Sequence, residues 1–349
     1  MKTIKTFFVI LLIAAVAACG GGGGGASGGN PGGGSSGPIY TVSTLTLDQA
    51  LSAPSGLTIA QGNLYVADTG ANLIKKIENL SNSTANVSSV LGGGASAYST
   101  CSGSMLSSPY GVAIDSAGIL YVSEQSSADI RYSDCVPPGN SSFQYGTLSV
   151  LSSPSAIALH DDNHLYVADT GNHKIRLITK TTPPRGGTTT LLAGTSSGYV
   201  DGASNISAFS SPTGIAVSSS GDVFVTDTDN CAVRKISAGQ VSTLAGAYPT
   251  SCGSTDGTTT AARFNHPTGV AVDASGNLYV ADTGNRKIRR ITPQGVVTTI
   301  AGSGAIGFAD GTGSSATFNT PTGIAVDTSG NVFVADYGSG KIRKITVTP

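Results

Sequence analysis

A motif that begins with Pro occurs six times along the chain. The copies start at Pro54, Pro109, Pro154, Pro212, Pro267 and Pro321, which lie 55, 45, 58, 55 and 54 residues apart. Self-similarity at such a period is the signature of a repeat architecture, in which each copy forms one supersecondary unit. We therefore expect one repeat array to fill residues 39–349.

Each copy predicts four short β-strands. In the fifth copy, the apolar run GVAVD (269–273) is typical of a buried strand, and NLYVAD (277–282) is rich in β-branched and aromatic residues. A turn containing Gly276 separates these strands, KIRRI (287–291) predicts a third, and VVTTIAG (296–302) a fourth. Four strands per unit indicate the blade of a β-propeller, because a solenoid would need polar capping repeats.

The sixth copy is not followed by a fourth strand. The sequence Thr41-Val42-Ser43-Thr44-Leu45 repeats the pattern of the fourth strand at 241–244 and precedes the first copy. We expect residues 40–46 to pair with residues 341–345, which would cover the outer edge of the last blade and close the ring.

The consensus P-x-G-[IV]-A-[VI]-D-x-x-G-N-[LV]-[YF]-V-A-D-T-G-N-x-K-I-R-[KR]-I resembles the NHL repeat. The resemblance covers residues 40–349; the second copy departs most, with Ser123-Glu124-Gln125 in place of Ala-Asp-Thr. It implies an all-β, six-bladed β-propeller of four-stranded blades, closed by an N-terminal strand that completes the last blade. It does not fix the function, because the family includes RNA-binding modules, sensor domains and a zinc-dependent amidating lyase.

The amino terminus predicts an export signal. Lys2 and Lys5 precede an apolar run, Phe7 to Ala18, that is too short to span a bilayer comfortably. The end of this run, Val16-Ala17-Ala18-Cys19, resembles the bacterial lipobox, in which the Cys is lipidated. A plain signal peptide, or a buried helix with an incidental Cys, is the alternative.

We therefore expect residues 1–18 to be a lipoprotein signal peptide, and residues 19–38 to be the lipidated Cys19 and a Gly-rich flexible tether. The predicted location is the bacterial cell envelope, with a lipid anchor in the outer membrane or at the cell surface rather than in the inner membrane.

Export to an oxidising compartment permits disulfides between the four other cysteines, Cys101, Cys135, Cys231 and Cys252. Three pairings are possible. By strand parity Cys231 and Cys252 lie in loops on the same face, so we favour that pair. A bond between Cys101 and Cys135 follows only by elimination, because their loops nominally leave opposite faces.

The charge of the chain argues against a nucleic-acid partner. Lys and Arg number 19 against 20 Asp and Glu, and loss of Lys2 and Lys5 with the signal would leave 17 against 20. No global positive field exists to hold a phosphate backbone. A basic residue recurs on the third strand and an acidic residue ends the second in each copy, so we expect cross-strand ion pairs.

The predicted channel mouth carries small neutral residues. Where the innermost strands begin, the ring consists of Ser55, Tyr110, Ser155, Thr213, Thr268 and Thr322. Calcium-dependent propeller enzymes need converging carboxylates there, and the zinc lyase needs three His. The chain has only four His, of which only His266 is near the channel. We therefore predict no catalytic, cofactor-binding or metal-binding residues.

Tyr110 and His266 stand out at this mouth as candidate binding residues. They belong to blades two and five, which are opposed in a six-bladed ring, so both could overlook one opening. The alternative is that both are loop residues that only fill space.

The loops before blades four, five and six share an Asp-Gly pair followed by a Phe. We expect each Asp to cap a short helical turn and each Phe (Phe209, Phe264 and Phe318) to pack between blades. These loops lie on one face, which is the best candidate for binding.

Together these features predict a monomeric, non-catalytic binding module for a protein, peptide or glycan. The alternatives are a lyase or hydrolase at the channel mouth and a purely structural envelope component.

Overall fold

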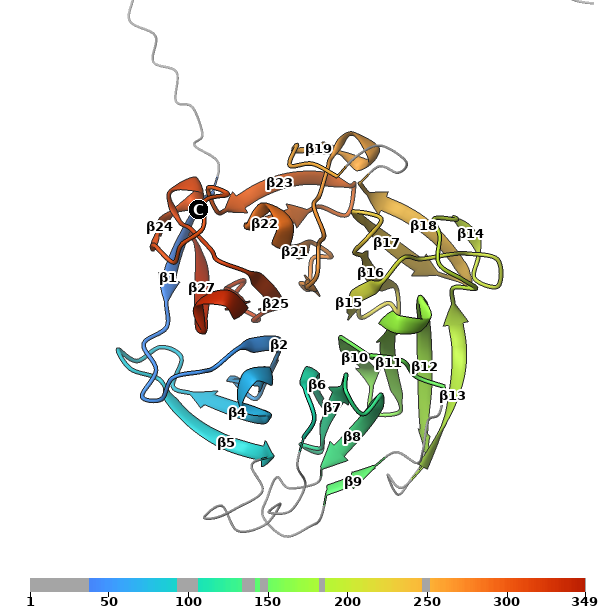
Figure 1. Ribbon diagram of the computed structural model, residues 1–349. Coiled ribbons are helices and arrows are strands. Elements are labelled where there is room, and N and C mark those ends of the chain that lie inside the picture. The colour runs from blue at the N-terminus through green and yellow to red at the C-terminus, as the bar shows by residue number, and fades with distance from the viewer. Residues whose placement is uncertain are drawn as a thin grey trace, which may run out of the picture. The chain divides into compact units, whose positions relative to one another are not determined.

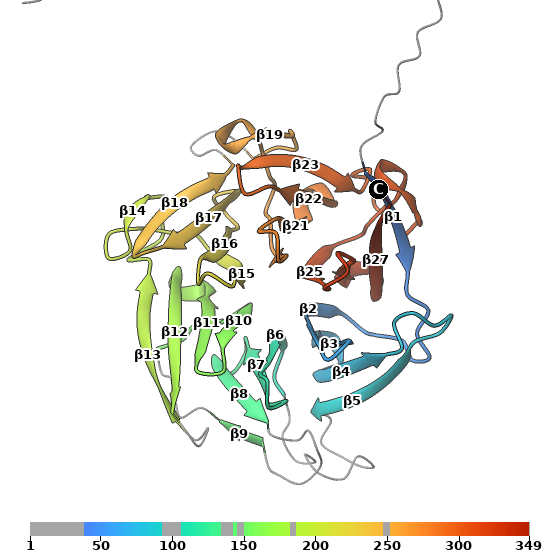
Figure 2. The same cartoon turned by 180° about the vertical axis from the view of Figure 1, so that it is seen from behind.

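The computed structural model describes residues 38–92, 106–133, 142–144, 150–181, 186–246 and 252–348. Six antiparallel sheets surround a central axis, and consecutive copies of the motif form consecutive sheets (Figures 1 and 2). The prediction of an all-β, six-bladed propeller is confirmed. The predicted leader and tether, together with Cys19, Cys101 and Cys135, lie outside the described residues.

The first three blades have four strands each. Blade 1 comprises β2 (Pro54–Ala60), β3 (Asn63–Asp68), β4 (Leu73–Glu78) and β5 (Asn86–Gly92). Blade 2 comprises β6 (Pro109–Ile114), β7 (Leu120–Glu124), β8 (Asp129–Ser133) and β9 (Ser142–Gln144). Blade 3 comprises β10 (Ile157–Asp161), β11 (His164–Asp169), β12 (Lys174–Thr181) and β13 (Gly186–Ala193).

The last three blades have five strands each, listed here from the channel outward. Blade 4 comprises β15 (Pro212–Val217), β16 (Val223–Asp227), β17 (Ala232–Ser237), β18 (Gln240–Ala245) and β14 (Gly202–Ala203). Blade 5 comprises β20 (Val270–Val272), β21 (Leu278–Asp282), β22 (Lys287–Ile291), β23 (Val296–Ala301) and β19 (Gly257–Thr258). Blade 6 comprises β25 (Pro321–Val326), β26 (Val332–Asp336), β27 (Lys341–Thr348), β1 (Ile39–Thr44) and β24 (Gly311–Thr312).

The ring is closed by β1, as predicted. It pairs antiparallel with β27 over its whole length, with Val42 opposite Ile345 and Thr44 opposite Arg343. Val42 is buried in the cluster that joins blades 5 and 6. The N-terminal strand therefore completes the last blade (Figure 1).

The prediction of four strands per blade holds for blades 1 to 3 and is incomplete for blades 4 to 6. In each of these blades the loop that leads into the blade first passes its outer edge and adds a strand of two residues there, β14, β19 or β24. Unpaired edges of sheets invite association with other chains, so this fifth strand protects part of each edge.

Apolar residues of neighbouring sheets pack against each other to form the core. The clusters join residues of successive blades, and Phe209, Phe264 and Phe318 are fully buried in them, as predicted. Near the axis the innermost strands approach so closely that a Cβ atom on Gly323 would lie 1.9 Å from the carbonyl oxygen of Ser55. The Gly of the Pro-x-Gly motif therefore permits the contact between neighbouring blades.

Candidate functional site

The two faces of the ring differ in what they expose. We call the face where the innermost strands begin the loop face, because it carries the long loops between blades and the short 3-10 turns that follow the second strands, such as Thr69–Ala71. We call the opposite face the turn face. It carries the turns between first and second strands and those between third and fourth strands.

On the loop face the channel narrows to a cavity of about 50 Å³. Its lining includes Tyr110, Thr268 and Thr322, three of the six residues of the predicted ring, together with the Gly residues of the Pro-x-Gly motifs. The channel widens toward the turn face to about 250 Å³, where Thr58 is the one polar residue among the lining residues described. Neither cavity is lined by a carboxylate or an imidazole among the described residues.

The hydroxyl groups of the mouth link the blades in a closed circle. In each blade one Ser or Thr donates a hydrogen bond to a backbone carbonyl of the next blade, and blade 6 donates to blade 1. The donors are Ser55, Ser123, Ser155, Thr226, Thr268 and Thr322. We call this set the hydroxyl belt. Its residues are occupied with holding the ring together, which explains why they recur.

Ser123 supplies the belt hydroxyl of blade 2, as Thr226 does at the same strand position of blade 4. In blade 2, Tyr110 occupies the position where Ser55 supplies the belt hydroxyl in blade 1. Ser123, which replaces the Ala of the motif, donates to the carbonyl of Ser155 instead. The second blade thus keeps its link and contributes an aromatic residue to the lining of the mouth.

A second Thr in the regular blades reinforces the belt. Thr69, Thr170, Thr228 and Thr283 each donate to the carbonyl of the next repeat Pro, at 2.6 to 2.7 Å. In blade 6 this position is Tyr337, which is 41% exposed. Tyr337 is therefore the residue that the sequence analysis missed. The signal was a single Tyr in the Ala-Asp-Thr position of an otherwise regular copy.

Tyr110 and Tyr337 lie within electrostatic reach of each other, although blade 1 separates their blades. Burial and, to a lesser extent, the interaction with Tyr337 raise the pKa of the Tyr110 phenol to about 12. The phenol is protonated at neutral pH and can donate a hydrogen bond.

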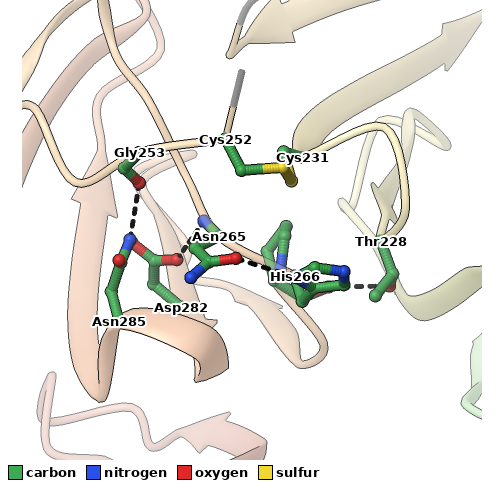
Figure 3. The surroundings of a disulfide bond; sticks show 9 residues. Thr228, Cys231, Cys252, Gly253, Asn265, His266, Asp282 and Asn285 are labelled. Atoms are coloured by element: carbon green, nitrogen blue, oxygen red, sulfur yellow. Dashed lines mark hydrogen bonds between the residues drawn. A yellow bond between two sulfur atoms is a disulfide. The ribbon is translucent and has the colours of Figure 1, made fainter.

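His266 does not join Tyr110 in the lining of the cavity. It is exposed on the loop face, with a left-handed φ of 45° and a 2.8 Å contact from Nδ1 to Asn265 Oδ1. The backbone N–H of Asn265 donates to Asp282 (Figure 3). The structure thus places His266 beside the mouth, on the side of blade 5.

The structure joins Cys231 and Cys252 by a disulfide, the pairing that the sequence favours (Figure 3). Cys231 is the left-handed residue after the second-strand turn of blade 4, and Cys252 lies in the loop leading to blade 5. At the same position in blades 1 and 3, Asn72 and His173 accept a hydrogen bond from the backbone of the next blade. In blade 4 the disulfide links the same position to an earlier residue of the next loop.

The Asp residues of the Asp-Gly loops do not cap helical turns, contrary to our expectation. Asp256 instead binds the buried Arg289 at 2.7 Å and accepts hydrogen bonds from the backbone N–H and hydroxyl of Thr299. Arg289 also contacts Asp282 at 2.7 Å and lies over the ring of Phe264. Arg234 and Arg343 repeat the arrangement with Asp201 and Asp310. Because an Arg has several donors and a carboxylate accepts several hydrogen bonds, this cluster ties each loop to the strands of its own blade.

The predicted cross-strand ion pairs are confirmed for blades 2 to 6, whereas the pair recorded in blade 1, Lys76 with Glu78, lies within one strand. Besides Arg234, Arg289 and Arg343, Arg131 pairs with Glu124 and Arg176 with Asp169. The recurring basic residues therefore stabilise the blades and form no continuous basic surface.

Within the described part of the chain, no group of three His, Cys, Asp or Glu side chains is placed to hold a metal ion. No helix there is long and apolar enough to cross a membrane.

Family models match separate parts of the ring. The NHL repeat matches residues 151–176, 209–236 and 318–345, and the Teneurin NHL domain matches residues 247–309. The chain thus carries NHL repeats in a six-bladed β-propeller, as the resemblance implied.

Two curated relatives are similar over 39% of this chain. NHL repeat-containing protein 2 of Bos taurus is 34% identical over 149 residues, and Protein SUPPRESSOR OF QUENCHING 1 of Arabidopsis thaliana is 31% identical over 147. The matched stretch spans only 20% and 14% of those proteins.

Solved structures resemble the fold at low identity. An auxiliary nutrient binding protein of Bacteroides ovatus has a TM-score of 0.65 at 18% identity, over 89% of this chain and 78% of that one. Virginiamycin B lyase of Staphylococcus aureus has a TM-score of 0.54 at 18% identity, over 88% of this chain and 100% of that one.

Proposed function

We propose that this protein is an exported, lipid-anchored and non-catalytic binding module, whose loop face holds a protein, peptide or glycan over the channel mouth. The observation that carries the proposal is the pair Tyr110 and Tyr337, which stand where other blades have a Ser or Thr that links neighbouring blades. Tyr110 lines the mouth, and Tyr337 lies within electrostatic reach of it and is 41% exposed. Aromatic residues at a solvent boundary combine contact area with a polar end, which is why binding surfaces are rich in them.

Exposed apolar side chains extend this surface. Ile306 and Phe308, in the loop leading to blade 6, are 67% and 59% exposed. Lys341 lies 5.0 Å from the centre of the Phe308 ring, so one edge of the patch is cationic. Contiguous exposed apolar area rimmed by polar residues is typical of interaction sites. The similarity to an auxiliary nutrient binding protein supports a binding role.

The binding role is tested by screening the protein on glycan and peptide arrays. Every positive is then remeasured with Tyr337→Ala and with Phe308→Ser, both exposed and safe for folding. Each variant should weaken binding at least tenfold. Glu78→Gln, at an exposed ion pair on the turn-face side of blade 1, serves as the control and should bind normally. If neither loop-face substitution changes the affinity for a ligand, that ligand binds elsewhere on the protein.

The lipid anchor is a separate part of the proposal, and Cys19→Ser tests it. Several acyl chains at one residue contribute about 0.8 kcal/mol per buried methylene, enough for stable membrane attachment. The variant should therefore move from the membrane fraction to the soluble exported fraction. If the variant stays in the membrane fraction, the lipid anchor is refuted, whereas the proposed binding role is unaffected.

The enzyme alternative has its own test, because propeller lyases share this fold. If the channel held a divalent ion essential to the fold, EDTA would lower the thermal midpoint by many degrees, and adding metal would restore it. We expect EDTA to leave the midpoint nearly unchanged.

A further inference from the structure

A separate cavity of about 150 Å³ lies on the turn face between blades 4 and 5. Its lining includes Asp222, Lys235 and Phe224 from blade 4 and Thr292 and Pro293 from blade 5. It is distinct from the loop face and independent of the proposed function.

The turn of blade 4 carries its carboxylate in a different place from the turns of blades 5 and 6. In blade 5, Asp273 holds the turn by accepting the backbone N–H of Ser275 and Asn277 and the side-chain amide of Asn277. Asp327 and Asn331 do the same in blade 6. In blade 4, Ser218 takes the position of the Asp, and Asp222 takes the position of the Asn.

Because of this exchange, the carboxylate of Asp222 does not hold the turn and instead lines the cavity. The Ser218 hydroxyl accepts the backbone N–H of Asp222, so the turn is still held. The carboxylate of Asp222 instead pairs with Lys235 at 2.8 Å, and the two side chains are 24% and 32% exposed. A residue that recurs in every blade serves the fold, whereas this exchange occurs in one blade, at a cavity.

Asp222 is ionised at neutral pH. Burial alone would raise its pKa, but hydrogen bonds from Lys235 and Ser237 outweigh that effect and hold the pKa below its usual range. The cavity therefore presents one negative and one positive group side by side.

The other wall of the cavity is apolar. Phe224 is nearly buried, and the Lys235 ammonium lies 5.8 Å from the centre of its ring. Leu244 and Pro293 continue this wall. A ligand here needs one apolar face and an edge that both donates and accepts hydrogen bonds.

We propose that the cavity binds one pyranose ring of a neutral saccharide, whose hydroxyls donate to Asp222 and accept from Lys235 while its C–H face packs on Phe224 and Pro293. A cavity of roughly 150 Å³ holds a six-membered ring. A neutral ligand leaves the Asp222–Lys235 pair balanced, whereas an anion would face Asp222 and a cation would face Lys235. Burying a charge without a partner is costly.

The test is saturation-transfer NMR on the full chain with methyl β-D-glucopyranoside, methyl β-D-galactopyranoside, the tetramethylammonium cation and methyl phosphate as probes, each of which has C–H protons to observe. We expect at least one glycoside to bind with a millimolar dissociation constant, the range for a ligand of this size, and both charged probes to fail. Binding of a charged probe alone, or of none, overturns the proposal.

The site is then located by Ser218→Asp/Asp222→Asn, which installs the turn of blades 5 and 6. Because the same turn occurs in blades 5 and 6, the thermal midpoint of this variant should be unchanged. Its affinity for the glycoside should fall at least tenfold. The reverse exchange in blade 6, Asp327→Ser/Asn331→Asp, is the matched control and should leave affinity unchanged.

Ser220→Trp fills the exposed rim of the cavity and gives the same readout if the double variant fails to fold. Glycoside binding that survives both changes refutes the site. Loss of binding in Tyr337→Ala would assign the glycoside to the loop face instead.

Discussion

Blades 4 to 6 and blades 1 to 3 share one strand motif but bury its basic residue differently. In blades 4 to 6 the Arg is fully buried and lies between the Asp of its second strand and the Asp of a long loop. In blade 3, Arg176 remains 14% exposed and pairs only with Asp169. Arg131 of blade 2 is also partly exposed, at 23%, although Pro54 and Pro109 lie as far apart as Pro212 and Pro267. Full burial of the Arg therefore accompanies the Asp-Gly loop, which only blades 4 to 6 have, and does not follow from loop length alone.

The largest effect is expected from deleting residues 39–47, which removes β1 from blade 6. The deletion exposes the edge of β27 and the core around Val42, and it separates the fifth strand β24 from its partner. The unfolding midpoint should fall sharply, because the ring loses its closure. Deleting residues 20–37 is the control and should leave the midpoint nearly unchanged. Equal stability of the two deletions would mean that the second half of the ring does not need β1.

Removing the strand carboxylate should cost more in blade 5 than in blade 3. Asp282→Ala leaves the fully buried Arg289 with only the exposed Asp256, and an uncompensated buried charge costs about 3–5 kcal/mol. Asp169→Ala should cost less, because water reaches Arg176. Urea unfolding of both variants measures the difference.

The double variant Asp282→Ala/Arg289→Met serves as the control for this pair. Replacing both charges by apolar groups removes the unpaired Arg and should recover much of the loss. If Asp169→Ala lowers the free energy of unfolding as much as Asp282→Ala does, burial of the Arg does not explain the difference between blades 1 to 3 and blades 4 to 6.

The disulfide distinguishes blade 4 from blades 1 and 3, which have a hydrogen bond at the same position. Cys231→Ser/Cys252→Ser should lower stability by about 2–4 kcal/mol, since the bond closes a loop between residues 21 apart. His173→Ala, at the same position in blade 3, removes one hydrogen bond from the Ser211 N–H and should cost about 1 kcal/mol. Thermal unfolding with and without reductant gives both values. A double Cys variant no less stable than His173→Ala would show that the covalent link adds nothing.

The periodic part of the sequence was sufficient to predict the strands, the blade count and the closure by β1. Each of these features depends on a pattern that recurs in every copy. A position that is ambiguous in one copy can therefore be assigned from the other copies. The burial of Phe209, Phe264 and Phe318 was predictable for the same reason.

The contacts made by single residues could not be predicted. The partner of Asp256 is Arg289, 33 residues away on a strand of the same blade, and only the folded loop brings them together. The strands β14, β19 and β24 have two residues each, too few to show a pattern. Tyr337 and Asp222 are single departures whose meaning depends on what the neighbouring blade places beside them.

The smallest effect tests the loop carboxylates that set blades 4 to 6 apart. Asp256 is nearly half exposed, and exposed ion pairs contribute about 0–1 kcal/mol. Asp256→Asn should therefore lower the free energy of unfolding at pH 7 by no more than about 1 kcal/mol. Asp310→Asn in blade 6 should behave alike.

The pH dependence of that small loss identifies its origin. Burial alone would raise the pKa of Asp256, but hydrogen bonds from Thr299 and the charge of Arg289 outweigh it and lower the pKa below its usual range. A carboxyl group with a lowered pKa stabilises the fold fully above its unfolded value of about 3.9, and this contribution disappears as the pH falls through the folded value. The pH dependence contributed by Asp282 has the opposite sign. Burial raises the pKa of Asp282, so ionisation of this carboxyl destabilises the fold as the pH rises from its unfolded to its folded pKa. Only the difference between wild type and Asp256→Asn isolates the loop residue. That difference should be constant from pH 7 to 5 and shrink as the pH falls below the unfolded value of about 3.9 toward the folded value. If the difference does not shrink there, the loop Asp acts through its shape and neutral hydrogen bonds, and its charge does not distinguish the two halves of the ring.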